Sequence, residues 1–148
     1  MCNYFVKYYK EDFDWIAHID IDEYINIRND KSLKENLSNY KDATSILMIW
    51  ENYNANGHIY RPEGKITDNY TTVCGSMGTD RKIWICKIFG NLSKNPEWIN
   101  CHYSTDFKKQ NDIYIKHYIT KSFEDYCFRI YERGDMYRRV YRNLDMFF

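Results

Sequence analysis

Three acidic side chains follow a short apolar run near the start of the chain. In the segment DWIAHIDIDEYI, residues 14–25, Asp20, Asp22 and Glu23 occupy the part of a buried strand that would be most hydrophobic. Alternate residues of an extended segment face the same side, so Asp20 and Asp22 are placed to bind one ion together. Carboxylates with open coordination positions suit Mg²⁺ or Mn²⁺, which also bind phosphate oxygens. In an α/β protein such a site would lie at the carboxyl end of a strand.

Two other interpretations of these acids stay open. In the first, the strand has ended and the carboxylates are solvated. In the second, Asp22 or Glu23 starts a turn or caps a neighbouring element.

The elements that must position these residues alternate between strands and helices. Strands are predicted at 14–20, 43–50, 81–89 and 97–104, and helices at 3–10, 29–41, 122–133 and 136–148. Ser32 and Glu35 have the spacing of a capping box, Ser122 can cap the following helix, and Gly134 can end it. The apolar run 43–50 suits the centre of a sheet that is covered on both faces. This order predicts a single α/β or α+β domain over residues 1–148.

Composition limits the function classes. The chain has 148 residues, with 44% hydrophobic and 28% charged residues, which is typical of a soluble globular protein. Lys and Arg number 21, as do Asp and Glu, so no global field favours nucleic acid or an anionic membrane. The five Cys form no C-x-x-C pair and are expected to be reduced thiols. With no membrane-spanning apolar run and no signal-peptide core, a soluble intracellular protein is expected by default.

Four stretches of the chain resemble one enzyme family. Trp15 followed by IDIDEYI resembles the D-x-D-E segment of GT-A-type glycosyltransferases, in particular glycosyltransferase family 92 and its family-2-like relatives. WENYNANGH, residues 50–58, is similar to the family's Trp, aromatic-Gly and Gly-His loop, although Asn54 replaces a usual glycine. RKIWICKIF with His102 resembles the basic strand and the histidine after it. KHYITKSFEDYCFRIYERG, residues 116–134, resembles the His-Tyr, Lys-Ser and Arg-Gly segment.

The resemblance implies a partial GT-A (nucleotide-diphospho-sugar transferase-like) fold, with a mixed sheet flanked by helices. The N-terminal nucleotide-binding strands of such enzymes have no counterpart before residue 14, so the chain corresponds to the C-terminal half. A fragment, a degenerated copy and one half of a split enzyme with an N-terminal-half partner chain remain alternatives. On this view, the isolated chain is expected to transfer sugar poorly.

The implied reaction is metal-dependent transfer of a sugar from a nucleotide-sugar donor to a glycan or another hydroxyl acceptor. The residues that the resemblance singles out have these expected roles: Asp20, Asp22 and His117 as ligands of Mn²⁺ (or Mg²⁺), Asp20, Lys121 and Ser122 in donor binding, Trp50, Tyr53 and His58 in acceptor binding, and Glu51 as general base. The helix after Ser122 would point its amide groups at the diphosphate. A non-catalytic remnant and a metal-dependent phosphoryl-transfer enzyme are the alternative functions.

Overall fold

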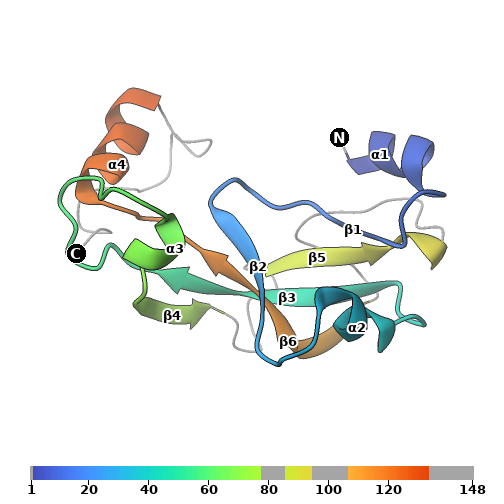
Figure 1. Ribbon diagram of the computed structural model, residues 1–148. Helices are drawn as coiled ribbons and strands as arrows, with labels where there is room; N and C mark the ends of the chain where they lie inside the picture. Colours follow the sequence, from blue (N-terminus) through green and yellow to red (C-terminus); the bar gives the residue numbers. More distant parts are fainter. Residues whose placement is uncertain (1, 78–85, 95–106, 134–148) are drawn as a thin grey trace. The chain divides into compact units, whose positions relative to one another are not determined.

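The computed structural model describes residues 2–77, 86–94 and 107–133 (Figure 1). It has an α/β fold with a mixed sheet and few helices. The strands are β1 (Trp15–Ala17), β2 (Glu23–Ile27), β3 (Ser45–Tyr53), β4 (Val73–Met77), β5 (Cys86–Asn91) and β6 (Lys108–His117). The helices are α1 (Cys2–Tyr9), α2 (Leu33–Ser38), α3 (Ile66–Asn69) and α4 (Phe123–Cys127), with a 3₁₀ turn, η1 (Leu92–Lys94), and a π-helix, η2 (Phe128–Arg133). None of the described helices has the length and apolar character needed to cross a bilayer.

The six described strands form one sheet with the order β1-β5-β3-β6-β2, and β4 pairs with β3. β5 is antiparallel to both β1 and β3, and β2 is antiparallel to β6. The arrows of β3 and β6 point the same way in Figure 1. β3 therefore occupies the centre of the sheet, as its apolar sequence predicts.

The chain divides into two compact units. Unit 1 takes in Met1–Glu51 and Ser76–His117, and unit 2 takes in Asn52–Gly75 and Tyr118–Phe148. Each unit has a buried cluster of its own, and that of unit 2 consists of Tyr53, Tyr70 and Tyr118.

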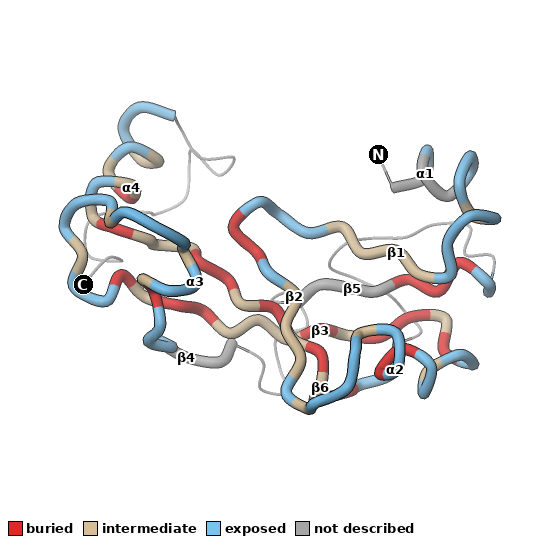
Figure 2. Tube along the Cα trace, in the orientation of Figure 1, coloured by how far each residue is buried: buried red, intermediate tan, exposed pale blue. Residues whose placement is uncertain are grey.

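The core of unit 1 is built on alternate residues of β3 and β6. Ile46, Met48 and Ile115 are 0% exposed and Ile113 is 1% exposed, and buried positions recur along both strands in Figure 2. Since successive side chains of a strand face opposite sides, these residues share one face of the sheet. Leu37 of α2 packs on the same cluster, with Leu33 beside it. Burial of each such side chain contributes about 1.5–3 kcal/mol, so this face fixes the register of both strands.

The helix starts at α2 and α4 follow the capping pattern predicted from the sequence. The Ser32 hydroxyl accepts a hydrogen bond from the Glu35 amide at 3.2 Å, and the Glu35 carboxylate accepts one from the Ser32 amide at 2.7 Å. At α4 the Ser122 hydroxyl accepts from the Asp125 amide at 3.1 Å. The predicted helix 122–133 is α-helical only to Cys127 and continues as a π-helix.

Three strands were not predicted from the sequence. β4 and β6 cover residues left without an element, and β2 begins at Glu23, where the acidic segment was expected to end a single strand. The strand predicted at 14–20 is shorter, ending at Ala17, whereas the one predicted at 43–50 extends to Tyr53. The predicted strand 97–104 and helix 136–148 lie outside the described residues, as does the first part of 81–89.

Candidate functional site: the acidic turn and its neighbours

The acids of the D-x-D-E segment lie in a turn between β1 and β2. The Glu23 amide donates to the Asp20 carbonyl at 3.0 Å, and the Asp20 amide donates to Glu23 Oε2 at 2.7 Å. The prediction that Asp20 and Asp22 share one face of an extended segment is therefore wrong, because the chain reverses between them. The turn interpretation holds for Glu23, whose carboxylate closes the turn.

The three acids differ in their exposure. Asp20 is exposed, whereas Asp22 is 7% and Glu23 3% exposed. Ile21, between the two aspartates, is 89% exposed at the tip of the turn. Asp20 is thus the carboxylate of this segment that a ligand in solution reaches most readily.

His117 lies beside this turn, as predicted. The register of β2 and β6 places it directly opposite Glu23, and it is 6% exposed. Directly opposed residues of an antiparallel pair have their Cβ atoms about 5 Å apart, on the same face. The fold therefore brings together two segments that are more than ninety positions apart in the sequence, around Glu23 and around His117.

Trp50 contacts the same histidine from the other side of β6. The Trp50 and His117 rings have centroids 4.4 Å apart and are tilted by 37°. Trp50 also packs against the core cluster that contains Ile46 and Met48, so it projects from the core face of β3. The indole packs against the imidazole on one side and against the core on another. This packing occupies part of the ring surface that was expected to contact an acceptor sugar.

Glu51, the predicted general base, projects from the opposite face of β3. Neighbouring residues of a strand alternate, and Glu51 pairs with Arg28 rather than with His117. The Arg28 guanidinium lies 4.1 Å from the centre of the Tyr114 ring and donates to the Asn111 carbonyl at 3.0 Å. Burial and the Glu51 carboxylate raise the pKa of Tyr114. A carboxylate held by an arginine on this face is poorly placed to take a proton at the His117 face.

The predicted three-residue metal site is not assembled. Within the described part of the chain, no group of three or more His, Cys, Asp or Glu side chains is arranged to hold one ion. The turn explains this result, since it points Asp20 to solvent while Asp22 is buried. The donor set that fits a cation here is smaller, namely one or two carboxylates, which is the usual protein share when Mg²⁺ also binds phosphates.

Tyr53 and His58 belong to the packing of unit 2. Tyr53 is 7% exposed, and its ring lies 5.0 Å from that of Tyr118. His58 Nε2 lies 3.2 Å from the Asn69 carbonyl, and the ring meets Tyr70 edge-on at 5.5 Å. Both side chains fix the loop that follows β3, so their predicted contact with an acceptor sugar has no support in these contacts.

The start of α4 is closed to an anion. The amides of Phe123 and Glu124 donate to the carbonyls of residues 58 and 59, at 3.0 and 2.9 Å. The Asp125 amide donates to Ser122, which is 0% exposed and whose hydroxyl donates to the Asp125 carboxylate at 2.9 Å. The prediction that these amides face a diphosphate is therefore wrong, because each already has a partner within the unit.

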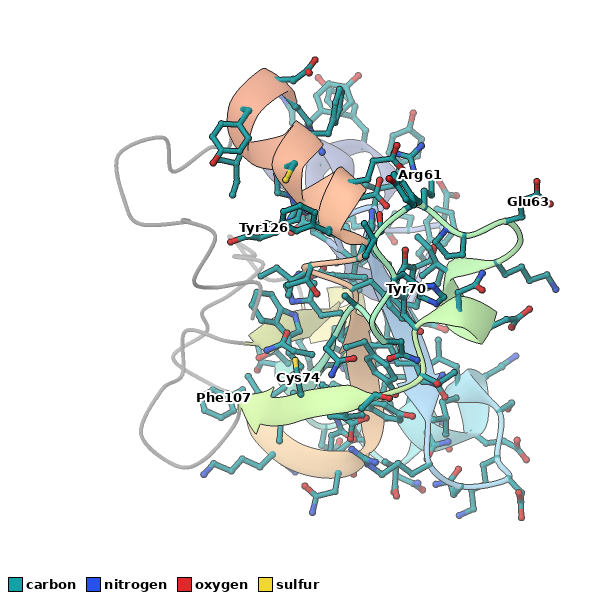
Figure 3. All side chains as sticks on the ribbon, turned by 90° about the vertical axis from the view of Figure 1, so that its left-hand side faces the viewer. Arg61, Glu63, Tyr70, Cys74, Phe107 and Tyr126 are labelled. Carbon is teal, nitrogen blue, oxygen red and sulfur yellow. The ribbon has the colours of Figure 1, made fainter. Side chains whose placement is uncertain are left out.

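Lys121 and Arg61 border a hollow beside α4. Its volume is about 420 Å³, and Tyr70 and Asp125 also line it. Figure 3 shows Arg61 close to the first turn of α4, where it forms an ion pair with Asp125. Desolvation raises the pKa of Asp125, but hydrogen bonds from Arg61 and Ser122 outweigh it and hold this pKa below its usual value. Lys121 adopts a left-handed backbone conformation, with φ of 55°, which a lysine rarely adopts.

Some contributors to these sites were missed in the sequence. Arg28 and Tyr114 received no role, and the alternation of Ile113, Ile115 and His117 with polar residues was the available signal for β6. His102, which follows the basic strand of the third resembling segment, lies outside the described residues. No protein-family model matches the chain, and the search of curated proteins found no match.

Proposed function

We propose that the chain is a GT-A-type glycosyltransferase domain that binds a nucleotide-sugar donor at the acidic turn and passes its sugar to a hydroxyl acceptor. The observation that supports this most is the meeting of three family-like segments at one end of β2, β6 and β3. Glu23 of the first segment lies opposite His117 of the last, and Trp50 of the second packs on that histidine.

The expected chemistry is departure of a nucleoside diphosphate. A divalent cation, Mn²⁺ or Mg²⁺, held by Asp20 and Asp22 would offset the charge that grows on the leaving oxygens. Glu23 fixes the turn that carries both aspartates, through its bond to the Asp20 amide. His117 and Trp50 give the turn a rigid, largely buried neighbour, so little conformational entropy is lost when a donor binds.

Donor binding without transfer is the second candidate function. Two observations favour it: Glu51 is paired with Arg28 on the other face, and the first-turn amides of α4 are already bonded. A domain of this kind would recognise the nucleotide sugar and leave the chemistry to another protein.

The test combines donor binding with a local reporter. UDP-sugars are titrated into the chain by calorimetry, with and without Mn²⁺, and Mn²⁺ is then added to isotope-labelled protein. We expect Mn²⁺-dependent binding, and selective paramagnetic broadening of the NMR signals of the His117 ring and the Trp50 indole. Product analysis of the same mixtures, with simple sugars as acceptors, separates transfer from binding alone.

The control applies the same Asp→Asn substitution inside and outside the turn. Asp20→Asn and Asp22→Asn should each weaken Mn²⁺-dependent binding by about tenfold or more, while Asp30→Asn, an exposed acid outside the turn, should not. Equal Mn²⁺-dependent binding of UDP-sugars by all three variants would mean that the donor does not bind at the acidic turn. No binding of any UDP-sugar with Mn²⁺ would remove the proposed donor class.

A further inference from the structure

A hollow of about 770 Å³ lies in unit 1 at the start of β1, whereas the acidic turn follows the end of that strand. Its walls come from the segment that leads into β1, from α2 and the turn after it, and from the junction of β5 with η1. The lining residues are Asp12, Phe13, Asp14, Trp15, Leu33, Lys34, Leu37, Ser38, Lys41, Asn91 and Ser93. This volume is within the range of about 300–1,000 Å³ that is usual for small-ligand sites.

The walls of the hollow are held by specific bonds. Asn91 is 2% exposed, and its side-chain amide donates to the Lys41 and Ala43 carbonyls at 3.0 and 2.9 Å. Its oxygen accepts from both the amide and the hydroxyl of Ser93. The Leu92 amide donates to the Asp14 carbonyl at 2.8 Å and ties the β1 segment to η1. The hollow is therefore formed before any ligand binds.

The lining joins an apolar surface to a charged rim of zero net charge. Trp15, Leu33 and Leu37 are apolar and partly or largely buried, and the Phe13 ring is 52% exposed. Two aspartates, Asp12 and Asp14, lie on the β1 side, and two lysines, Lys34 and Lys41, lie on the α2 side. Since the charges cancel, an anionic or cationic ligand gains little net attraction.

We propose that this hollow binds a neutral oligosaccharide. A sugar ring has apolar C–H faces, which suit aromatic and aliphatic side chains, and a rim of hydroxyl groups. Each hydroxyl both donates and accepts, so carboxylates, ammonium groups and Ser93 can all bond to it. A ligand with many hydroxyl groups and no charge matches both parts of the lining. The proposal depends only on this hollow and not on the transfer reaction proposed above.

The probe is a panel of neutral di- and trisaccharides, tested on the full chain by NMR titration. We expect at least one member to bind, with shifts at the Phe13 ring and the Ser93 amide. Phe13→Ala should weaken that binding by about threefold to tenfold, because it removes an aromatic face on which a sugar ring packs. Tyr4→Ala removes an aromatic ring that is 64% exposed and lies outside the hollow, so it should leave the affinity unchanged.

A comparison of two lysine variants distinguishes binding at the hollow from a general effect of surface charge. Lys34→Gln should weaken saccharide binding, and Lys31→Gln, just before α2 and outside the lining, should not. The idea is overturned if no neutral saccharide binds, if Phe13→Ala and Tyr4→Ala have equal effects, or if sialylated or phosphorylated sugars bind more tightly than the neutral ones. Phe13 and Lys34 are exposed, so circular dichroism should show both variants folded.

Discussion

Replacing the two helix-capping serines with alanine isolates the effect of burial on a cap. Ser32 and Ser122 have nearly the same backbone angles, with φ of −67° and −69° and ψ of 161° and 163°. Each hydroxyl accepts from the amide three residues on and donates to the carboxylate of that same residue. They differ in their surroundings: Ser32 is exposed, and Ser122 is 0% exposed.

The expected costs follow from that difference. Loss of an exposed N-cap costs about 1 kcal/mol, because water takes over the bonds that the hydroxyl made. At Ser122 water has no access, and Asp125, whose side chain is 15% exposed, loses a charged hydrogen bond as well. Such a bond is worth about 1.5–3 kcal/mol, part of which Arg61 preserves. We therefore expect about 2 kcal/mol for Ser122→Ala and about 1 kcal/mol for Ser32→Ala.

Amide hydrogen exchange measures the free energy of local opening separately for α2 and α4, which lie in different units. The Tyr126 amide donates to the Ser122 carbonyl and the Asn36 amide to the Ser32 carbonyl, both at 3.0 Å, so the two amides are equivalent reporters. The free energy of opening at Tyr126 should fall about twice as much as that at Asn36. A smaller fall at Tyr126 would refute the burial argument. If Ser122→Ala abolished UDP-sugar binding and left the exchange of the Tyr126 amide unchanged, Ser122 would have a role in donor binding rather than in helix capping.

Three further predictions concern an ion pair, a carboxylate and a buried amide. Because the folded-state pKa of Asp125 is depressed, its stabilising contribution is complete above the ordinary carboxyl pKa of about 3.9 and is lost as the pH falls through the folded-state value. Urea titrations should show the free energy of unfolding falling between about pH 5 and pH 2 as this contribution is lost. In Arg61→Gln the fall over the same pH range should be smaller, because Asp125 has lost its ion-pair partner. Glu51→Gln should change any sugar transfer less than about twofold, whereas a loss of about 10²-fold or more would identify a general base. Gln110→Leu should destabilise unit 1 by about 3 kcal/mol in urea titrations, because the Gln110 side chain bonds three backbone groups of β3 and β6, and no change would contradict this role.

The sequence predicts best where a local rule and the packing agree. The capping box at Ser32 and the N-cap at Ser122 depend on residues within one turn, so they can be predicted directly from the sequence. The central place of β3 follows from its unbroken apolar run. β6 was missed because its first half, KKQND, is polar and turn-like, and its pairing with β2 and β3 is decided by contacts distant in sequence. The Gln110 side chain stabilises this polar half of β6, because its amide donates to the carbonyls of Leu47 and Ile113. The sequence alone does not indicate these hydrogen bonds.

The candidate site was predicted in part. The nearness of His117 to the acidic segment was correctly expected, although its place opposite Glu23 follows from a strand pair that was not predicted. The shared face of Asp20 and Asp22 failed because spacing alone cannot distinguish an extended segment from a turn. Glu23 decides between them: its carboxylate bonds the Asp20 amide and folds the chain back into β2.

The excess of acids after β1 therefore has more than one physical cause. Glu23 is 3% exposed, and burial of a carboxylate is costly unless it accepts hydrogen bonds, a demand that the Asp20 amide meets in part. Asp20, whose amide makes that bond, is exposed, and Asp22 is 7% exposed, directly before the first residue of β2. If the aspartates act on a donor, they depend on Glu23 for their position, so Glu23→Ala should weaken Mn²⁺-dependent UDP-sugar binding without removing a ligand. Glu23→Gln keeps an oxygen for the Asp20 amide and should restore most of that binding. Equal losses in the two variants would mean that the Glu23 charge, rather than the turn it closes, is what the site requires.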